Sequence, residues 1–319
     1  MNIPLLDRLR DAAGCPIDRD ELVRDWPGAI ADIELLRAFG FELDVNSQGG
    51  VSYRRHAERL CPDQIEWELG TTRIGRRIAV WNRLASTNDL AAKAASSQAN
   101  DGLVILAEEQ TAGRGRRGRA WAAPHGSSIL LSVLIFPSGS LDDPAWLTAL
   151  GAVAVAEAVA EAVPDSNPRI KWPNDVRVDR RKIAGILVER SGGAAVIGIG
   201  LNVNAEMGDF PPELAETATS LRRLAGGYPL DRSDLVRRLI RALDHWYDLG
   251  LTAGPSSLDT PLAARSEHLG HPVRVETPLG PIVGRLEAIE VGRGITLLEA
   301  TGTIVRIASR EIRGLYPID

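Results

Sequence analysis

The chain has 319 residues, of which 44% are hydrophobic and 25% are charged, an ordinary globular composition that is long enough for two or three domains. Its formal net charge of −5 argues against a nucleic-acid-binding protein of overall basic character. The two cysteines, Cys15 and Cys61, lack the spacing of a disulfide framework or a zinc site, which is typical of a protein in the reducing cytoplasm.

Neither a signal peptide nor a membrane span is expected. The first residues carry Asp7 and Asp11 where a signal peptide needs an apolar core. The longest apolar stretch, residues 147–163, contains Glu157 and Glu161 and falls short of a membrane span. We expect this stretch to form a buried helix.

Residues 1–70 predict a winged-helix-like domain. A helix start is indicated by the acidic run at residues 18–21, and a helix with apolar residues at helical spacing is indicated over residues 30–39. Two short strand patterns, residues 41–45 and 51–53, flank the turn-forming stretch 46–50. Helices followed by a hairpin are typical of a winged helix.

Residues 71–268 alternate strands and helices, which predicts an α/β or α+β catalytic domain. The expected strands lie at residues 78–81, 103–107, 129–136, 169–172, 186–189 and 195–200, and the expected helices begin at Ser86 and span residues 144–163 and 231–249. The tail, residues 269–319, has four short strands broken by glycines, at residues 273–275, 284–286, 295–298 and 304–307. It predicts a small β-barrel, too small to carry chemistry alone.

The stretch Gly113–Arg119 holds four arginines and three glycines in seven residues. Glycines let a backbone approach a ligand closely, and arginines offer planar donors to phosphate or carboxylate. Four like charges repel one another, so we expect a mobile loop that an anionic ligand orders. The alternative is a solvated or nucleic-acid-binding basic loop, but its place inside a folded domain, followed by Trp121, favours a ligand pocket.

Two of the three lysines in the chain fall in a second polar region. Lys171 and Asp175 flank a Trp-Pro-Asn turn, where Asp175 could bind a metal ion or a ribose hydroxyl and Lys171 a phosphate; an ordinary turn is the alternative. Lys182 precedes the small pair Ala184-Gly185, so its ammonium can enter a pocket and stabilise charge on a phosphoryl or carboxylate oxygen.

Two further polar groups have both a structural and a binding interpretation. Ser86, Thr87 and Asn88 are standard helix-capping residues, but they also suit a polar ring such as a ureido group at a helix amino end. Asn202 and Asn204 follow a glycine-flanked strand, where they either face a nucleotide or close a turn.

Taken together and in this order, these motifs resemble the biotin protein ligases, especially the long bacterial type that doubles as the biotin operon repressor. The resemblance covers about residues 78–319, and the arginine–glycine loop and Lys-Trp-Pro-Asn-Asp run are its most specific parts. It implies an α+β protein in which a winged-helix-like domain (1–70), a catalytic domain with a mixed sheet (71–268) and an SH3-like β-barrel (269–319) follow one another.

The resemblance also implies residue roles. Biotin would be held by Ser86, Thr87, Asn88, Gln110, Arg114, Gly115, Arg116 and Lys182. ATP or the adenylate would be held, with Mg²⁺, by Arg116, Arg119, Trp121, Lys171, Asn174, Asp175 and Asn202. The catalytic residues would be Lys182, Arg116 and Lys171. The exact metal ligands are left open.

The implied reaction joins biotin to ATP, releases pyrophosphate, and passes the biotinyl group from biotinyl-5′-adenylate to a lysine of a biotin carboxyl carrier protein domain. The implied partners are this acceptor and a second copy of the chain in a homodimer. A lipoyl or octanoyl ligase of the related fold is the alternative enzyme, although those relatives lack the arginine–glycine loop.

DNA binding is the alternative from another functional class, and residues 1–70 depart from the repressor pattern. Residues 26–36, which match the recognition helix, look shorter and carry Asp32 and Glu34. Residues 1–70 contain 8 arginines, no lysine and 14 acidic residues, a net charge of −6. Because phosphate binding needs positive charge, we expect a winged-helix remnant that has lost its affinity for DNA.

Overall fold

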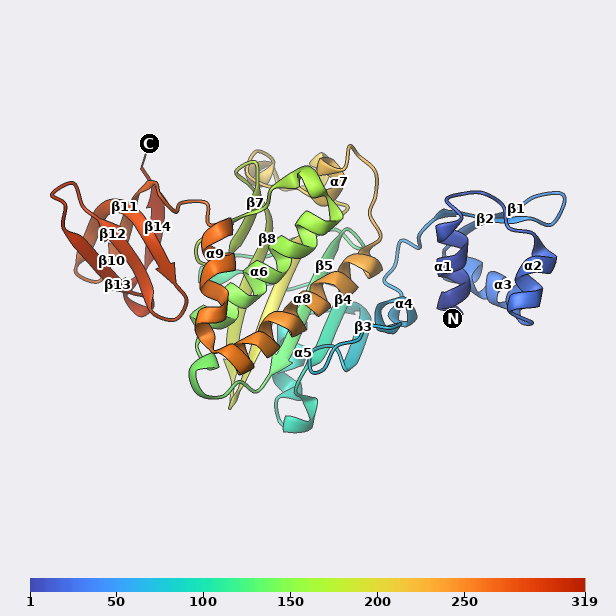
Figure 1. Cartoon of the computed structure of the whole chain (residues 1–319), viewed down its shortest axis with the longest axis horizontal. Coiled ribbons are helices and arrows are strands. Elements are labelled where there is room, and N and C mark those ends of the chain that lie inside the picture. Colours follow the sequence, from blue (N-terminus) through green and yellow to red (C-terminus); the bar gives the residue numbers. More distant parts are fainter. Residues whose placement is uncertain (319) are drawn as a thin grey trace. The chain divides into compact units, whose positions relative to one another are not determined.

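The computed structural model of the chain describes residues 1–318, which form two compact units (Figure 1). One unit comprises residues 1–69 with 231–237, and the other comprises residues 70–230 with those from 238 onward. The helices are α1 (Ile3–Asp11), α2 (Arg19–Asp25), α3 (Ala29–Phe39), α4 (Pro62–Glu66), α5 (Thr87–Ala94), α6 (Pro144–Ala162), α7 (Leu221–Leu224), α8 (Arg232–Ala253) and α9 (Asp259–Arg265).

The strands of the described residues form three sheets. A two-stranded sheet pairs β1 (Glu42–Val45) with β2 (Val51–Arg55). The large sheet contains β3 (Arg77–Leu84), β4 (Leu103–Gln110), β5 (Ser128–Ile135), β6 (Arg169–Lys171), β7 (Asp175–Val178), β8 (Arg181–Ser191) and β9 (Ala194–Asn202). The third contains β10 (Pro272–Thr277), β11 (Gly280–Glu290), β12 (Gly294–Leu298), β13 (Ile304–Ala308) and β14 (Gly314–Pro317).

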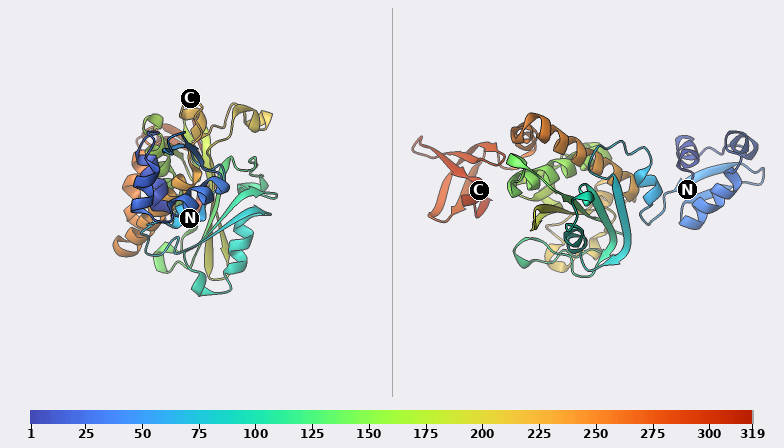
Figure 2. Two further views of the ribbon diagram at one scale, coloured as in Figure 1. Left: turned by 90° about the vertical axis from the view of Figure 1, so that its right-hand side faces the viewer. Right: turned by 90° about the horizontal axis from the view of Figure 1, so that it is seen from below.

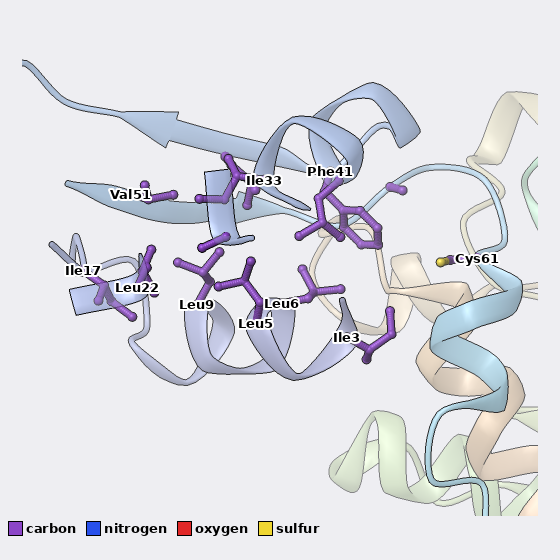
Figure 3. Packing of buried hydrophobic residues seen from close by; sticks show 14 residues of the cluster. Ile3, Leu5, Leu6, Leu9, Ile17, Leu22, Ile33, Phe41, Val51 and Cys61 are labelled. Atoms are coloured by element: carbon purple, nitrogen blue, oxygen red, sulfur yellow. The ribbon is translucent and has the colours of Figure 1, made fainter. Parts of the chain in front are cut away.

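The first unit packs three helices against the β1–β2 hairpin. The helix start expected at residues 18–21 is confirmed, since the Asp18 carboxylate caps α2 by accepting from the backbone N–H groups of Asp20 and Glu21. Apolar side chains from α1, α3 and the hairpin fill a common core, as Figure 3 shows for Leu5, Leu9 and their neighbours. This core gives the small unit its own hydrophobic centre.

The large sheet of the second unit is mixed. Its strand order is β3-β4-β5-β9-β8-β7-β6, with β3 and β4 parallel and the other neighbours antiparallel. The expected mixed α/β architecture of the central region is thus confirmed. The sequence missed β7, because Asp175 was assigned to a turn, whereas it begins a strand and pairs with Lys171.

Alternation along the central strand β9 assigns each face of the sheet to a helix. Ile197 points toward α6, where it lies against Gly151. Val196 points the other way and joins Ala91 of α5 in a common apolar cluster. The helices α6 and α5 therefore cover opposite faces (Figure 2), and residues of β9 with even numbers face α5.

Helix α6 is the expected apolar helix. Among residues 1–318 it is the one helix that is long and apolar enough, by length and composition, to cross a membrane, but 67% of its most apolar 18-residue stretch is buried inside the fold. Core helices of folded domains have the same length and composition. The burial confirms the expectation of a buried helix.

The tail forms a five-stranded antiparallel sheet in the order β13-β12-β11-β10-β14. The four strands expected from the glycine-broken pattern are present. The fifth, β14, was missed because the sequence Gly-Leu-Tyr-Pro is too short to show an alternating pattern.

Candidate functional site

The amino end of α5 forms the floor of the site. Ser86 is the N-cap residue of α5 by backbone geometry, yet its side chain accepts no capping hydrogen bond. Ser86, Thr87 and Asn88 are all buried and line a cavity of about 50 Å³. Simple capping therefore does not account for these three residues.

Asn88 is held in one orientation by its neighbours. Its Nδ2 donates to Glu189 Oε2 at 2.6 Å, and its Oδ1 accepts from Ser132 Oγ at 2.5 Å. Gly198 lies directly beneath it, and a Cβ there would come within 2.3 Å of Asn88 Oδ1. Gly198 has an even number in β9 and so belongs to the face that α5 covers.

Gln110 is fixed by α5 from the end of β4. Its Oε1 accepts from the Thr87 backbone N–H at 2.7 Å and from Thr87 Oγ1 at 3.0 Å. Its Nε2 keeps both hydrogens as donors beside the cavity. A neutral polar wall of this kind suits an uncharged polar ring.

The arginine–glycine stretch is a short hairpin. Arg114 and Ala120 form an antiparallel bridge, and the Trp121 backbone N–H donates to the Gly113 carbonyl at 2.9 Å. Beyond the bridge, Arg116 Nη1 donates to Asn174 Oδ1 at 2.9 Å. Burial lowers the Arg116 pKa, and the neighbouring Arg117 charge lowers it further. Arg116 is thus a partly desolvated cation that favours an anionic partner.

The Trp121 ring lies on two facing glycines. Gly185 and Gly200 are register partners in β8 and β9, and a Cβ at Gly200 would come within 2.4 Å of the ring. The buried Trp121 Nε1 has no hydrogen-bond partner among the described residues. Lys182 Nζ lies 5.6 Å from the ring centroid, within cation–π range.

Both Lys171 and Lys182 are neighbours of Asp175. Lys182 Nζ lies 2.7 Å from Asp175 Oδ1. Lys171 pairs with Asp175 across the β6–β7 hairpin. Burial lowers the Lys171 pKa, and the Arg177 charge lowers it further, while Asp175 opposes the shift.

The residues line two adjoining cavities. The smaller cavity, about 50 Å³, is lined by Ser86, Thr87, Asn88, Gln110, Arg114, Gly115, Arg116, Trp121, Asn174 and Lys182, among others. The larger, about 400 Å³, is lined by Gly115, Arg116, Arg119, Trp121, Lys171, Asn174, Asp175, Lys182 and Asn202, among others. The residues that border both cavities, and so mark their junction, are Gly115, Arg116, Trp121, Asn174 and Lys182.

Comparison with known proteins places the chain in a family. The profile of the Biotin/lipoate A/B protein ligase family matches residues 80–204. The biotin--[acetyl-CoA-carboxylase] ligase of Mycobacterium tuberculosis is 39% identical over 272 residues, which are 78% of this chain and 98% of that protein. The chain belongs to the biotin protein ligase family.

Two further biotin protein ligase relatives agree with this assignment. The Bacillus subtilis protein named bifunctional ligase/repressor BirA is 32% identical over 88% of this chain and 87% of its own length. The biotin protein ligase from Aquifex aeolicus, solved in complex with biotin and ATP, superposes with a TM-score of 0.68 at 26% identity and covers 76% of this chain and 100% of its own. The resemblance drawn from the motifs is confirmed.

The fold brings the motif residues of this biotin protein ligase together, with one exception. Asn204 lines neither cavity; its side chain joins two distant segments by donating to the Leu230 carbonyl and accepting from the Leu230 N–H, each at 2.9 Å. Asn202 donates to the Thr219 carbonyl at 3.0 Å and lines the larger cavity.

Sequence reasoning missed several lining residues. The larger cavity is also lined by Phe210, Leu214, Thr217, Ala218, Ile312, Arg313, Gly314, Leu315 and Tyr316. Residues 312–316 come from the start of the last strand, which no local pattern could connect with residues 171–175. Ser132 and Glu189 were missed as supports of Asn88, although their places on the α5 face follow from strand alternation once the register is known.

Proposed function

We propose that this chain is an ATP-dependent biotin protein ligase, which activates biotin as biotinyl-5′-adenylate and transfers it to a lysine of a biotin carboxyl carrier domain. One observation carries the proposal: a cavity with a neutral polar wall at the amino end of α5 meets a cationic cavity at Lys182 and Arg116. The carboxylate of a ligand in the first cavity would face the α-phosphate of a nucleotide in the second. Family membership supplies the identity of the two ligands.

The biotin ring would lie at the amino end of α5. Ser86, Thr87, Asn88 and Gln110 offer hydroxyl and amide groups, and Gly115 lets the hairpin backbone come close. The smaller cavity is narrow, with a volume of about 50 Å³, well below the usual range of ligand pockets. The bicyclic ring therefore enters only if the hairpin or the Trp121 ring moves aside.

The nucleotide would occupy the larger cavity, whose volume of about 400 Å³ lies in the usual range of ligand pockets. Arg119, Trp121, Lys171, Asn174 and Asn202 would line it. The Trp121 ring and apolar lining residues such as Phe210 and Leu214 suit an adenine. The cationic side chains of Arg119 and Lys171 suit the phosphates.

The first step forms a mixed anhydride. A carboxylate oxygen of biotin attacks the α-phosphorus of ATP, the bond from that phosphorus to the bridging oxygen breaks, and pyrophosphate leaves. Lys182, Arg116 and Lys171 would offset repulsion between the two anions and align them. In the second step the acceptor amine attacks the acyl carbon and AMP leaves.

Mg²⁺ would be held mainly by the phosphates. The described residues contain no group of three or more His, Cys, Asp or Glu side chains placed to hold a metal ion. A single lining carboxylate, Asp175, fits Mg²⁺, which commonly keeps its waters and takes one or two carboxylates beside substrate phosphates. The bound ion would neutralise charge on those phosphates.

The proposed domain plan has three parts: residues 1–70 as a degenerate winged helix, 71–268 as the catalytic domain and 269–319 as an SH3-like barrel. The helix–hairpin order of the first part and the antiparallel sheet of the last support it. We further propose action in the cytoplasm and a homodimer. The repressor function that some relatives' names carry is not included, because the first part is acidic.

Pyrophosphate release with ATP, Mg²⁺ and either biotin or lipoate tests the proposal. We expect release with biotin that falls about 100-fold or more in Lys182→Ala and Arg116→Ala, as for loss of one preorganised donor. Lys93→Ala, an exposed lysine on α5, is the control and should retain activity. Release with lipoate alone would assign the chain to the lipoyl ligases, and release with neither would refute both activities.

A further inference from the structure

Two side chains tie the base of the arginine–glycine hairpin to the domain: the Trp121 ring packs on Gly185 and Gly200, and the Arg114 guanidinium forms ion pairs. Its two strands are joined by the Arg114–Ala120 bridge, with the Gly115 N–H donating to the Arg119 carbonyl at 2.7 Å. The tip, Arg116–Gly118, lies beyond this bridge. The groups that hold Arg114 therefore hold the first strand of the hairpin base, while Trp121 holds the second.

Two carboxylates grip the Arg114 guanidinium. Asp89 binds it in bidentate fashion, with Nη1 to Oδ2 at 3.0 Å and Nη2 to Oδ1 at 2.7 Å. Glu189 accepts from Nη2 at 3.3 and 3.2 Å. Asp89 lies in the first turn of α5 and Glu189 in β8, so the grip comes from two elements of the domain core.

The electrostatics favour a lasting grip. The hydrogen bonds from Arg114 lower the Asp89 pKa despite some burial, and the same contacts raise the Arg114 pKa. An isolated exposed ion pair stabilises little, but a bidentate pair within a network of charges fixes geometry. The contribution of this cluster is therefore positional.

Glu189 also reaches the floor of the smaller cavity. The same carboxylate that accepts from Arg114 accepts from Asn88 Nδ2 at 2.6 Å, and Asn88 in turn accepts from Ser132. The hairpin base and the proposed biotin floor thus share one carboxylate. A displacement of the hairpin base would therefore displace the proposed biotin floor through Glu189, and the reverse.

We propose that Asp89 and Glu189 form a clamp that anchors the hairpin through Arg114, and that this clamp keeps the adenylate enclosed. Arg114, Asp89 and Glu189 are then positioning residues, and Arg114 holds the hairpin rather than the ligand. The clamp itself stands on the geometry, while its effect on the adenylate rests on the proposed function.

Limited trypsin digestion of the ligand-free protein tests the clamp alone. Cleavage within residues 113–121, identified by mass spectrometry, should be about tenfold faster in Asp89→Ala combined with Glu189→Gln, since an unanchored hairpin opens more often. The control is Asp142→Asn, which removes a similarly exposed pair with Arg190, the residue next to Glu189. Equal rates in the clamp variant and the control would overturn the anchoring role.

A double-mutant cycle separates anchoring from ligand contact. With biotin and ATP, free biotinyl-5′-adenylate recovered by ultrafiltration should rise about tenfold in Arg114→Ala, rise less in Asp89→Ala because Glu189 still holds Arg114, and rise no further in the double variant than in Arg114→Ala. Additive effects, or a biotin KM that rises in Arg114→Ala but not in Asp89→Ala, would show that Arg114 binds the ligand. If the unmodified protein, after denaturation to release bound product, yields no adenylate at all, the proposed function is refuted, and the digestion result still reports on the clamp.

Discussion

A glycine decides where the amide of Asn88 can lie. Gly198 faces α5 because β9 alternates, and only the absence of a side chain there leaves room for Asn88 between Ser132 and Glu189. The placement of the Asn88 side chain thus depends on a residue 110 positions later in the chain. The need for glycine at position 198 can therefore be tested by adding a single methyl group there.

Gly198→Ala should weaken biotin binding. The new Cβ would lie 2.3 Å from Asn88 Oδ1, which must shift, and overpacking of this kind costs about 1–3 kcal/mol. If the cost appears in the bound state, the biotin Kd rises about 5- to 150-fold. Calorimetric titration with biotin measures it. Gly193→Ala, in open space between β8 and β9, is the control, and equal affinities in the two variants would contradict the role of Asn88.

The pH dependence of the activity should reflect the ionisation of Lys171. Because burial and Arg177 lower its pKa, Lys171 loses its proton at a lower pH than an ordinary lysine, whose pKa is about 10.4. Pyrophosphate release should fall as pH rises through this lowered pKa. In Lys171→Arg the fall should move to higher pH, whatever the change in maximal rate, since arginine stays protonated. An unmoved alkaline limb would show that another group titrates.

At the scale of elements, one carboxylate fastens the start of the catalytic sheet to α8. Asp244 accepts from the backbone N–H groups of Thr72, Arg73 and Ile74 at 2.7, 2.9 and 2.7 Å. This segment leads directly into β3 and has no strand partner of its own to satisfy those donors. Helix α8 therefore supplies the hydrogen-bond acceptors that the sheet does not provide for these N–H groups.

Asp244→Ala should destabilise the catalytic unit by about 3 kcal/mol, because charged acceptors contribute strongly and buried donors are left unsatisfied. Urea denaturation followed by tryptophan fluorescence measures the loss. Asp248→Ala, an exposed position on the same helix, is the control and should change little. A similar midpoint for both variants would mean that water replaces the carboxylate.

At the scale of the whole molecule, charge is unevenly distributed. The chain carries −5 in total, while residues 1–70 alone carry −6. On α3, which overlaps the stretch expected from the sequence to correspond to a recognition helix, Arg37 is paired with Glu34 at 3.1 Å, and Leu35 is 56% exposed. Because its arginine is paired with a glutamate of the same helix and its exposed side chain is a leucine, α3 provides little positive charge for a phosphate backbone.

The full chain should therefore bind duplex DNA no better than non-specifically, with a Kd weaker than about 1 μM at physiological salt. A mobility-shift assay at low and moderate salt, with biotin and ATP present, measures it. Glu34→Lys should strengthen the weak binding by freeing Arg37 and adding positive charge. Nanomolar, operator-specific retardation of the unmodified chain would contradict the prediction.

The sequence alone determined what depends on local spacing and composition. Residues 18–21 begin a helix, the alanine- and valine-rich run becomes the buried α6, and the arginine–glycine stretch and the Lys-Trp-Pro-Asn-Asp run identify the family. Capping, turn and motif chemistry act over a few residues, so they can be read directly from the chain.

Only the tertiary structure decided which distant residues meet. The strand order places β9 between β5 and β8, and this brings Ser132, Glu189 and Gly198 to one face under Asn88. The packing of the five-stranded sheet, which contains β14, places residues 312–316 on the wall of the larger cavity. The physical reason is that alternation fixes a face only after register and neighbours are chosen, and those are set by packing of the whole sheet between its helices.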